Sequence, residues 1–132
     1  MRAGRGLPSL RHQLVSDMFR TALHLQRTRR YAPAFKVIEF SIQDDHVHLI
    51  VEATGKEDAG DALRSGISGL VISFAKRLNK LLGRKGKVWG DRWHGHELAT
   101  PSEVRNTLVS SRRSRGRHAR SIPCRVEGAL VA

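Results

Sequence analysis

The sequence contains little cysteine and no long apolar segment. Cys124 is the single cysteine among 132 residues, which excludes an intrachain disulfide and any zinc module built from cysteines. No apolar run approaches the roughly 20 residues that a membrane-spanning helix needs, and the N-terminus lacks the apolar core of a signal peptide. We therefore expect one soluble, cytoplasmic domain with a single core.

Acidic residues are also scarce. The chain has 12 Asp and Glu against 24 Lys and Arg, which gives a formal charge of +12 and a pI of about 11.4. A field of this sign favours a polyanionic partner, and nucleic acid is the ordinary one. An anionic membrane surface is the alternative. No predicted helix places bulky aromatic residues opposite a Lys/Arg face, however, so we expect no membrane contact.

Residues 37–52 predict a β-hairpin that carries two histidines. Two apolar runs rich in β-branched residues flank a polar break at residues 43–45. His46 and His48 begin the second strand, so both side chains should project from one face while Val47 turns towards the core. Two imidazoles on a rigid strand are a suitable pair of metal ligands. The alternative is that both lie on a solvated face and bind nothing.

This stretch resembles the His-hydrophobic-His motif of the HUH superfamily, in particular the single-tyrosine transposases and the REP-associated tyrosine transposases. The similarity extends over most of the chain, in blocks that keep the family's order: Phe40-Ser41-Ile42-Gln43, Asp45-His46-Val47-His48-Leu49-Ile50-Val51-Glu52, the helical segment that follows, Val88-Trp89-Gly90-Asp91-Arg92-Trp93-His94 and Thr100-Pro101-Ser102-Glu103-Val104-Arg105-Asn106. The resemblance implies an α+β fold, a ferredoxin-like antiparallel sheet with helices packed on it. It also implies a transposase that binds single-stranded or hairpin DNA, forms a homodimer and cleaves single strands with Mg or Mn held by His46 and His48.

The nucleophile of this family is missing from the position where the resemblance places it. The family attacks the scissile phosphate with a tyrosine on the C-terminal helix, four residues after the position of Asn106, and this chain has Ser110 there. Ser114, one turn further, stands where a polar side chain would complete the metal site. The only tyrosine is Tyr31, between the first predicted helix and strand. A serine hydroxyl is far less acidic than a phenol, and no base is evident nearby, so we expect strand cleavage to be impaired or lost.

Both ends of the chain also depart from the family. Residues 1–8 are predicted to be a loop, so the first strand of a ferredoxin-like fold is expected to be missing, which would leave its neighbours without ladder partners and the domain marginally stable. Residues 110–132 show no apolar periodicity, with five arginines and no acid between positions 110 and 120. They form either an arginine-rich nucleic-acid-binding arm or the product of a shifted reading frame. The predicted domain therefore spans residues 9–109.

Apolar spacing and capping residues predict the remaining elements. They are a helix over residues 9–29, strands over 34–42, 46–53 and 88–98, a helix over 58–83, and a helix from Thr100 to about residue 109. Gly66 and Gly69 interrupt the long helix, and either close packing on the sheet or a DNA contact explains them.

Basic and aromatic residues provide candidate DNA contacts. A basic run begins near the end of the long helix, and we expect it to contact phosphates, the alternative being a solvated helix end. Trp89 and Trp93 fall on one face of the predicted strand, where they either pack in the core or stack on nucleobases. The candidate DNA-binding residues are Lys76, Arg77, Lys80, Arg84, Lys85, Lys87, Arg92, Trp93 and Arg105.

Two other functions are compatible with these residues. A non-catalytic nucleic-acid-binding module would use the charge and the tryptophans without a metal. A metal-dependent hydrolase would combine His46 and His48 with the second His-x-His pair, His94 and His96, and it requires the two pairs to meet in space.

Overall fold

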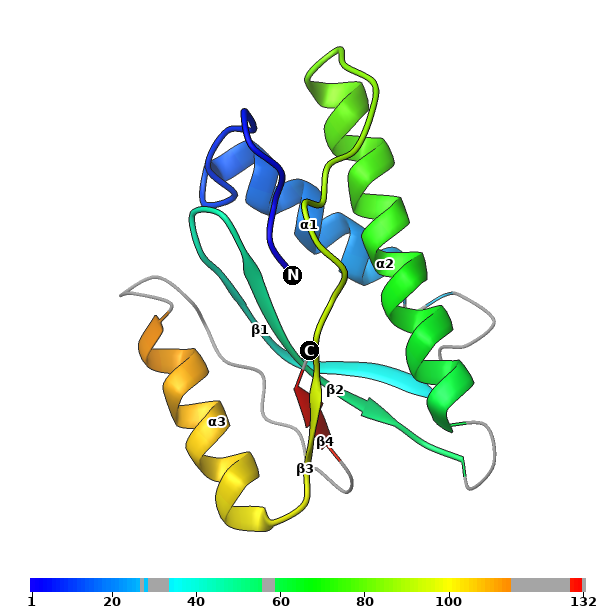
Figure 1. Ribbon diagram of the computed structural model, residues 1–132, viewed down its shortest axis with the longest axis vertical. Helices are drawn as coiled ribbons and strands as arrows, with labels where there is room; N and C mark the ends of the chain where they lie inside the picture. Colours follow the sequence, from blue (N-terminus) through cyan, green and yellow to red (C-terminus); the bar gives the residue numbers. More distant parts are fainter. Residues whose placement is uncertain (27, 29–33, 56–58, 115–128, 132) are drawn as a thin grey trace.

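The computed structural model describes residues 1–26, 28, 34–55, 59–114 and 129–131. Within these ranges the elements follow in the order α1 (Gln13–Gln26), β1 (Phe35–Ile42), β2 (Val47–Ala53), α2 (Ala59–Leu81), β3 (His96–Leu98), α3 (Pro101–Ser114) and β4 (Ala129–Val131), as Figure 1 shows. The predicted α+β class, an antiparallel sheet with helices packed on it, is confirmed. None of the helices in the described ranges is long and apolar enough to cross a membrane.

The sheet is organised around the β1–β2 hairpin. Its strand order is β1-β2-β4-β3, and every pairing is antiparallel. Ile42 pairs with Val47 at the closed end of the hairpin, where the backbone N–H of Gln43 donates to the carbonyl of His46 at 2.8 Å. The predicted hairpin with its polar turn is therefore confirmed.

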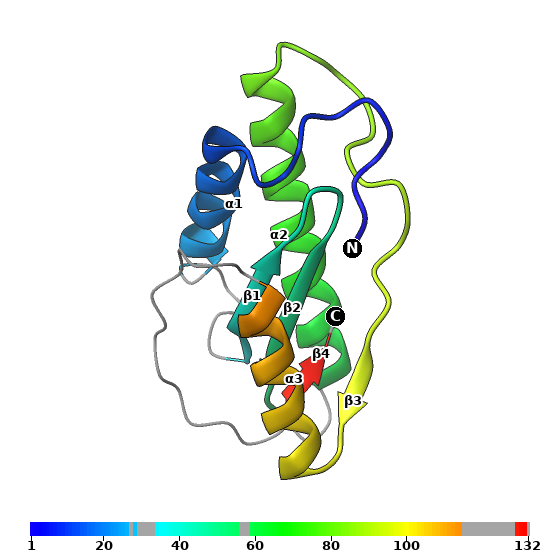
Figure 2. The same cartoon turned by 90° about the vertical axis from the view of Figure 1, so that its left-hand side faces the viewer.

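The helices α1 and α2 cover one face of the sheet, and α3 covers the other (Figures 1 and 2). The larger core lies between the sheet and the first two helices, where apolar side chains of β2 meet aromatic residues of α1 and α2. Its fully buried members include Phe19, Leu49, Val51, Ile67, Leu70, Phe74 and Leu78.

Gly66 of α2 allows this close packing. A Cβ built on Gly66 would come within 2.2 Å of the Phe35 ring. Because real Cβ atoms do not approach a ring so closely, only glycine fits here without a shift of helix or strand. Packing on the sheet therefore explains Gly66, one of the two alternatives considered from the sequence.

The capping box predicted at the start of α3 is present. The Thr100 hydroxyl accepts from the backbone N–H of Glu103 at 3.2 Å, and the Glu103 carboxylate accepts from the N–H groups of Thr100 and Ala99 at 3.0 and 2.9 Å. The helix continues to Ser114, beyond the predicted end near residue 109. Arginine is a good helix former, and Arg112 also reaches the buried Glu39 carboxylate of β1 at 3.9 Å.

Residues 1–4 partly fill the position of the expected first strand. Arg2 forms an isolated bridge to His46, and Ala3 forms one to Trp89. The carbonyl of Met1 accepts from the N–H of Val47 at 2.8 Å. No helix or strand element precedes α1 in the described ranges, yet this short segment supplies backbone partners to the start of β2, and β4 supplies them to its other half. The tail predicted over residues 1–8 is therefore paired at its beginning.

Two further predicted boundaries are wrong. Only residues 96–98 of the strand predicted over 88–98 form a strand. Residues 91–95 include charged residues and a glycine, which disfavour strand pairing, and they have no ladder partner among the described residues. The first helix begins at Gln13 rather than Ser9, because the Ser9 hydroxyl accepts from the N–H of Arg11 and donates to Asp44 of the hairpin turn. The irregular tail predicted over residues 110–132 is wrong where the structure describes it, because residues 110–114 continue α3 and Ala129–Val131 form β4, which pairs with β2 and β3. The rest of this tail, residues 115–128 and 132, lies outside the described residues, as does Tyr31.

Candidate metal site and nucleic-acid surface

His46 and His48 lie side by side on the face of the sheet that α3 covers. Val47 between them is 1% exposed and points into the core on the opposite face. The centroids of the two imidazole rings are 4.8 Å apart, and the ring planes are nearly perpendicular at 87°. The alternation of side chains along β2 therefore places the two rings together, as the sequence predicts.

Asp45 fixes the orientation of His46. Its carboxylate oxygen Oδ1 lies 2.6 Å from Nδ1 of His46, and Oδ2 lies 3.3 Å from Nε of Arg2. The hydrogen bond from His46, followed by the charges of His46 and Arg2, lowers the pKa of Asp45 below its usual value, so this carboxylate is ionised. An ionised carboxylate can only accept, so Nδ1 of His46 must carry the proton, and the lone pair of neutral His46 is left on Nε2.

His48 is held in its neutral form. Partial burial lowers the pKa of His48 below 6.5, and the positive charges of His46 and of the Met1 amino group lower it further. A neutral imidazole is the form that binds a metal ion. At neutral pH His48 therefore offers a lone pair rather than a charge.

The structure gives only part of a metal site. No group of three or more His, Cys, Asp and Glu residues close enough to hold an ion occurs among the described residues. Glu39 lies on the same face of the sheet, but it is buried and faces Arg112. The residues present thus fit a divalent ion bound by two imidazoles, with the remaining positions left to water or phosphate oxygens.

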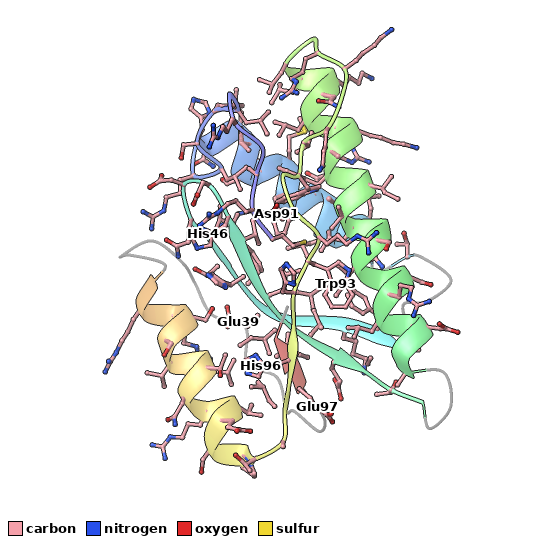
Figure 3. All side chains as sticks on the ribbon, in the orientation of Figure 1. Glu39, His46, Asp91, Trp93, His96 and Glu97 are labelled. Atoms are coloured by element: carbon pink, nitrogen blue, oxygen red, sulfur yellow. The ribbon has the colours of Figure 1, made fainter. Side chains whose placement is uncertain are left out.

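The second His-x-His pair does not join the first. His94 and His96 are exposed, and Figure 3 shows His96 well separated from His46. All four histidines belong to the described part of the chain, and no cluster of three metal-binding residues includes them. The hydrolase that would use all four histidines is therefore excluded.

The position expected for the nucleophile lies on α3. Ser110 is exposed in the second half of this helix, and Ser114 is its last residue. Because α3 packs on the face of the sheet that carries His46 and His48, the helix and the histidine pair lie on the same side of the molecule. The helix on which the resemblance places a nucleophile thus packs on the face that carries the two histidines, and the residue at the expected position is Ser110.

The predicted basic run gathers at the C-terminal end of α2 and in the loop that follows. The chain reverses there through Gly83 and Gly86, both with positive φ, and the side-chain amide of Asn79 donates to the carbonyl of Gly86 at 2.8 Å. None of the six cations has an ion-pair partner among the described residues, so no acid neutralises their charge. Arg84 and Lys87 donate to the backbone carbonyls of Lys87 and Gly90. They are Lys76, Arg77, Lys80, Arg84, Lys85 and Lys87, which we call the α2 basic end.

The two tryptophans have different environments. Trp89 is 7% exposed, its indole N–H donates to the carbonyl of Val71 at 3.2 Å, and its ring centroid lies 5.4 Å from that of Phe74. Trp93 is half-buried beside α2 (Figure 3) and lines an open groove together with Arg92. Arg105 is exposed on α3, away from this groove. Core packing thus accounts for Trp89, and Trp93 is available for stacking.

Sequence reasoning missed four residues that the structure brings to these surfaces. They are Arg2 and Asp45 beside the histidine pair, and Arg64 and Asp91 at the groove. Asp45 directly precedes His46, so its carboxylate could have been proposed as the group that orients this ligand. Nothing in the local sequence links Arg64 to residues 91–93, because that proximity depends on how α2 packs.

No family model, no curated protein and no solved structure matches this chain. A function is therefore proposed from the sequence and from the geometry of these surfaces.

Proposed function

We propose that this chain is a DNA-binding domain of the single-tyrosine HUH transposase type that holds a divalent metal, Mg or Mn, on His46 and His48 and has lost or reduced strand cleavage. Its partner is single-stranded or hairpin DNA. The resemblance of several sequence blocks to that family supports the proposal, as does the formal charge of +12. A homodimer is part of the same proposal.

The arrangement of Asp45, His46 and His48 is the observation that carries this proposal. Two imidazoles at a centroid distance of 4.8 Å, one of them oriented by a carboxylate, match the way in which proteins prepare histidines as metal ligands. Histidines that only cover a solvated face need no such carboxylate. The pair also projects from the face of the sheet on which α3 packs, the helix that corresponds to the one carrying the nucleophile in the family.

Each group has a distinct part in binding DNA. A divalent ion, when bound, acts as a Lewis acid on a phosphate oxygen. Asp45 keeps the proton of His46 on Nδ1, and the low pKa of His48 keeps that ring unprotonated at neutral pH. The α2 basic end attracts the phosphate backbone without selecting a sequence. A serine hydroxyl is far less acidic than the phenol of a tyrosine, so we propose that DNA is bound and not covalently attached.

Labelled DNA hairpins with Mn²⁺ or Mg²⁺ test this function. We expect metal-dependent binding in a mobility-shift assay and neither cleavage nor a covalent adduct on a denaturing gel. His46→Ala should abolish the metal dependence, whereas His94→Ala, which removes an exposed histidine outside the pair, should not. An adduct that Tyr31→Phe abolishes would contradict the loss of the nucleophile.

A non-catalytic nucleic-acid-binding module without a metal is the second candidate. The cations of the α2 basic end favour it, because charge alone gives affinity for DNA. Binding that EDTA and His46→Ala leave unchanged would select this candidate over the first.

A further inference from the structure

An open groove lies between α2 and the segment that leads from α2 to β3. It has a volume of about 530 Å³, which is within the range of small-ligand sites. Its lining comes from three parts of the chain, and the residues are Met1, Arg64, Ser68, Val71, Trp89, Asp91, Arg92 and Trp93. The histidine pair is not among them, so this groove is a separate site.

The walls of the groove suit a flat aromatic ligand. Trp93 is half-buried against the core, which fixes its ring, and Val71 and Met1 add apolar surface. Trp89 closes the inner end, held by its hydrogen bond to the carbonyl of Val71. A fixed indole beside aliphatic side chains is the usual platform on which an unpaired nucleobase stacks.

The rim of the groove suits a phosphate backbone. The Arg64 side chain is 77% exposed, and its guanidinium makes a loose ion pair of 3.8 Å with Asp61. Arg92 is exposed and has no ion-pair partner among the residues that the structure describes. Two exposed guanidinium groups around an aromatic wall would neutralise the phosphates that flank a stacked base.

Asp91 gives the groove a chemical preference. Its carboxylate is exposed, lines the groove and engages no hydrogen bond or ion pair within the described ranges. An unpaired base exposes its Watson–Crick edge. There cytosine, adenine and guanine each offer an amino group to a carboxylate, whereas thymine offers one N–H between two carbonyl oxygens that repel it. A carboxylate repels phosphate groups, so Asp91 does not serve to attract the DNA backbone. Contact with a base accounts better for an acid at this position.

We infer that this groove binds one unpaired base that carries an amino group, namely cytosine, adenine or guanine, of a DNA strand. The base stacks on Trp93, its amino group donates to Asp91, and Arg64 and Arg92 hold the adjacent phosphates. This inference rests on the proposed function, because it assumes that single-stranded DNA is the partner.

The test compares hairpins with identical stems and a short single-stranded overhang of either dC or dT. The affinity of the full chain is measured by fluorescence anisotropy of the labelled DNA. We expect the dC overhang to bind about tenfold more tightly than the dT overhang. Asp91→Asn should reduce this preference, because an amide can also donate to the O4 of thymine. Glu97→Gln removes the same charge from an exposed residue outside the groove and should keep the preference.

Stacking is tested separately with Trp93→Leu, which keeps apolar bulk against the core. We expect it to weaken binding of the dC overhang about tenfold, as removal of a stacking side chain does. Trp89 is then the only tryptophan, so its fluorescence and the thermal melt report whether the fold is retained. DNA should quench the fluorescence of the wild type and not that of this variant.

The outcomes separate this inference from the proposed function. If the wild type binds the hairpins but treats dC and dT alike, and Trp93→Leu binds as the wild type does, the groove inference is wrong and the proposed function stands. If the folded wild type binds none of these DNAs, both are wrong.

Discussion

The Asp45 carboxylate accepts a hydrogen bond from Nδ1 of His46 at 2.6 Å. This contact directs the other ring nitrogen, Nε2, away from Asp45, where it can bind a metal ion. Asp45→Asn should therefore weaken binding of Mn²⁺ about tenfold, because losing such a partner typically costs about 10 to 100-fold in metal affinity. Isothermal titration calorimetry with the metal alone measures this change.

Asp44→Asn is the matched control for that variant. Asp44 is the neighbouring acid of the same turn, and it accepts from the Ser9 hydroxyl at 2.9 Å instead of contacting a histidine. Equal metal affinity of the two variants would show that Asp45 does not orient a ligand.

A second prediction concerns pH. The pKa of His48 in the folded protein is below 6.5, so the unfolded chain takes up a proton first as the pH falls. The free energy of unfolding should therefore decrease below about pH 6.5. It should level off below the pKa of His48 in the folded protein. Asp45 does not contribute in this window, because its pKa is lowered from 3.8 and it stays ionised.

Urea unfolding between about pH 7.5 and pH 5.5 measures that effect, because the window spans the ordinary histidine pKa. His48→Gln cannot titrate, so its unfolding midpoint should fall less with acid than that of the wild type. NMR titration of the His48 ring gives an independent check. A ring that titrates above the ordinary value of 6.5 would contradict the lowered pKa.

Local patterns predicted the hairpin and the capping box because both are decided by neighbouring residues. The polar break at residues 43–45 ends one apolar run and starts the next, and Thr100 and Glu103 bond to each other's backbone. The position of the histidine pair follows from strand alternation alone. For this part of the site, the sequence was sufficient.

The prediction of a strand over residues 88–98 was wrong because strand pairing depends on partners that are distant in the sequence. Trp89 finds Ala3 and the carbonyl of Val71, whereas residues 91–95 find no neighbouring strand in the described part of the chain. The same dependence hid the groove, since Arg64 and Asp91 approach each other only through the packing of α2. No local pattern carries such information.

The close approach of Gly66 to Phe35 leads to a third prediction. Gly66→Ala should lower the free energy of unfolding by about 1 to 3 kcal/mol, because the new methyl group would overlap the Phe35 ring and force a shift of the packed helix. Urea unfolding at neutral pH gives the difference.

Gly60→Ala is the control on the same helix. A Cβ at Gly60 would meet nothing within 4 Å, so alanine should be neutral or stabilise by up to about 1 kcal/mol through helix propensity. Combining Gly66→Ala with Phe35→Leu should recover part of the loss. If the loss of unfolding free energy in the double variant equals or exceeds the sum of the losses in the two single variants, the Phe35 ring is not the obstacle.

The α2 basic end provides the last prediction. Lys80 and Lys85 are exposed and have no ion-pair partner among the described residues, so replacing both by glutamine should not affect folding. Each phosphate-binding lysine contributes about 0.7 to the slope of log K against log salt for single-stranded DNA, so the double variant should reduce this slope by about 1.4. Lys36→Gln removes an exposed lysine from β1, outside the basic end, and should leave the slope unchanged. If the double variant keeps the wild-type slope, these lysines are a solvated helix end and the DNA contacts a different surface.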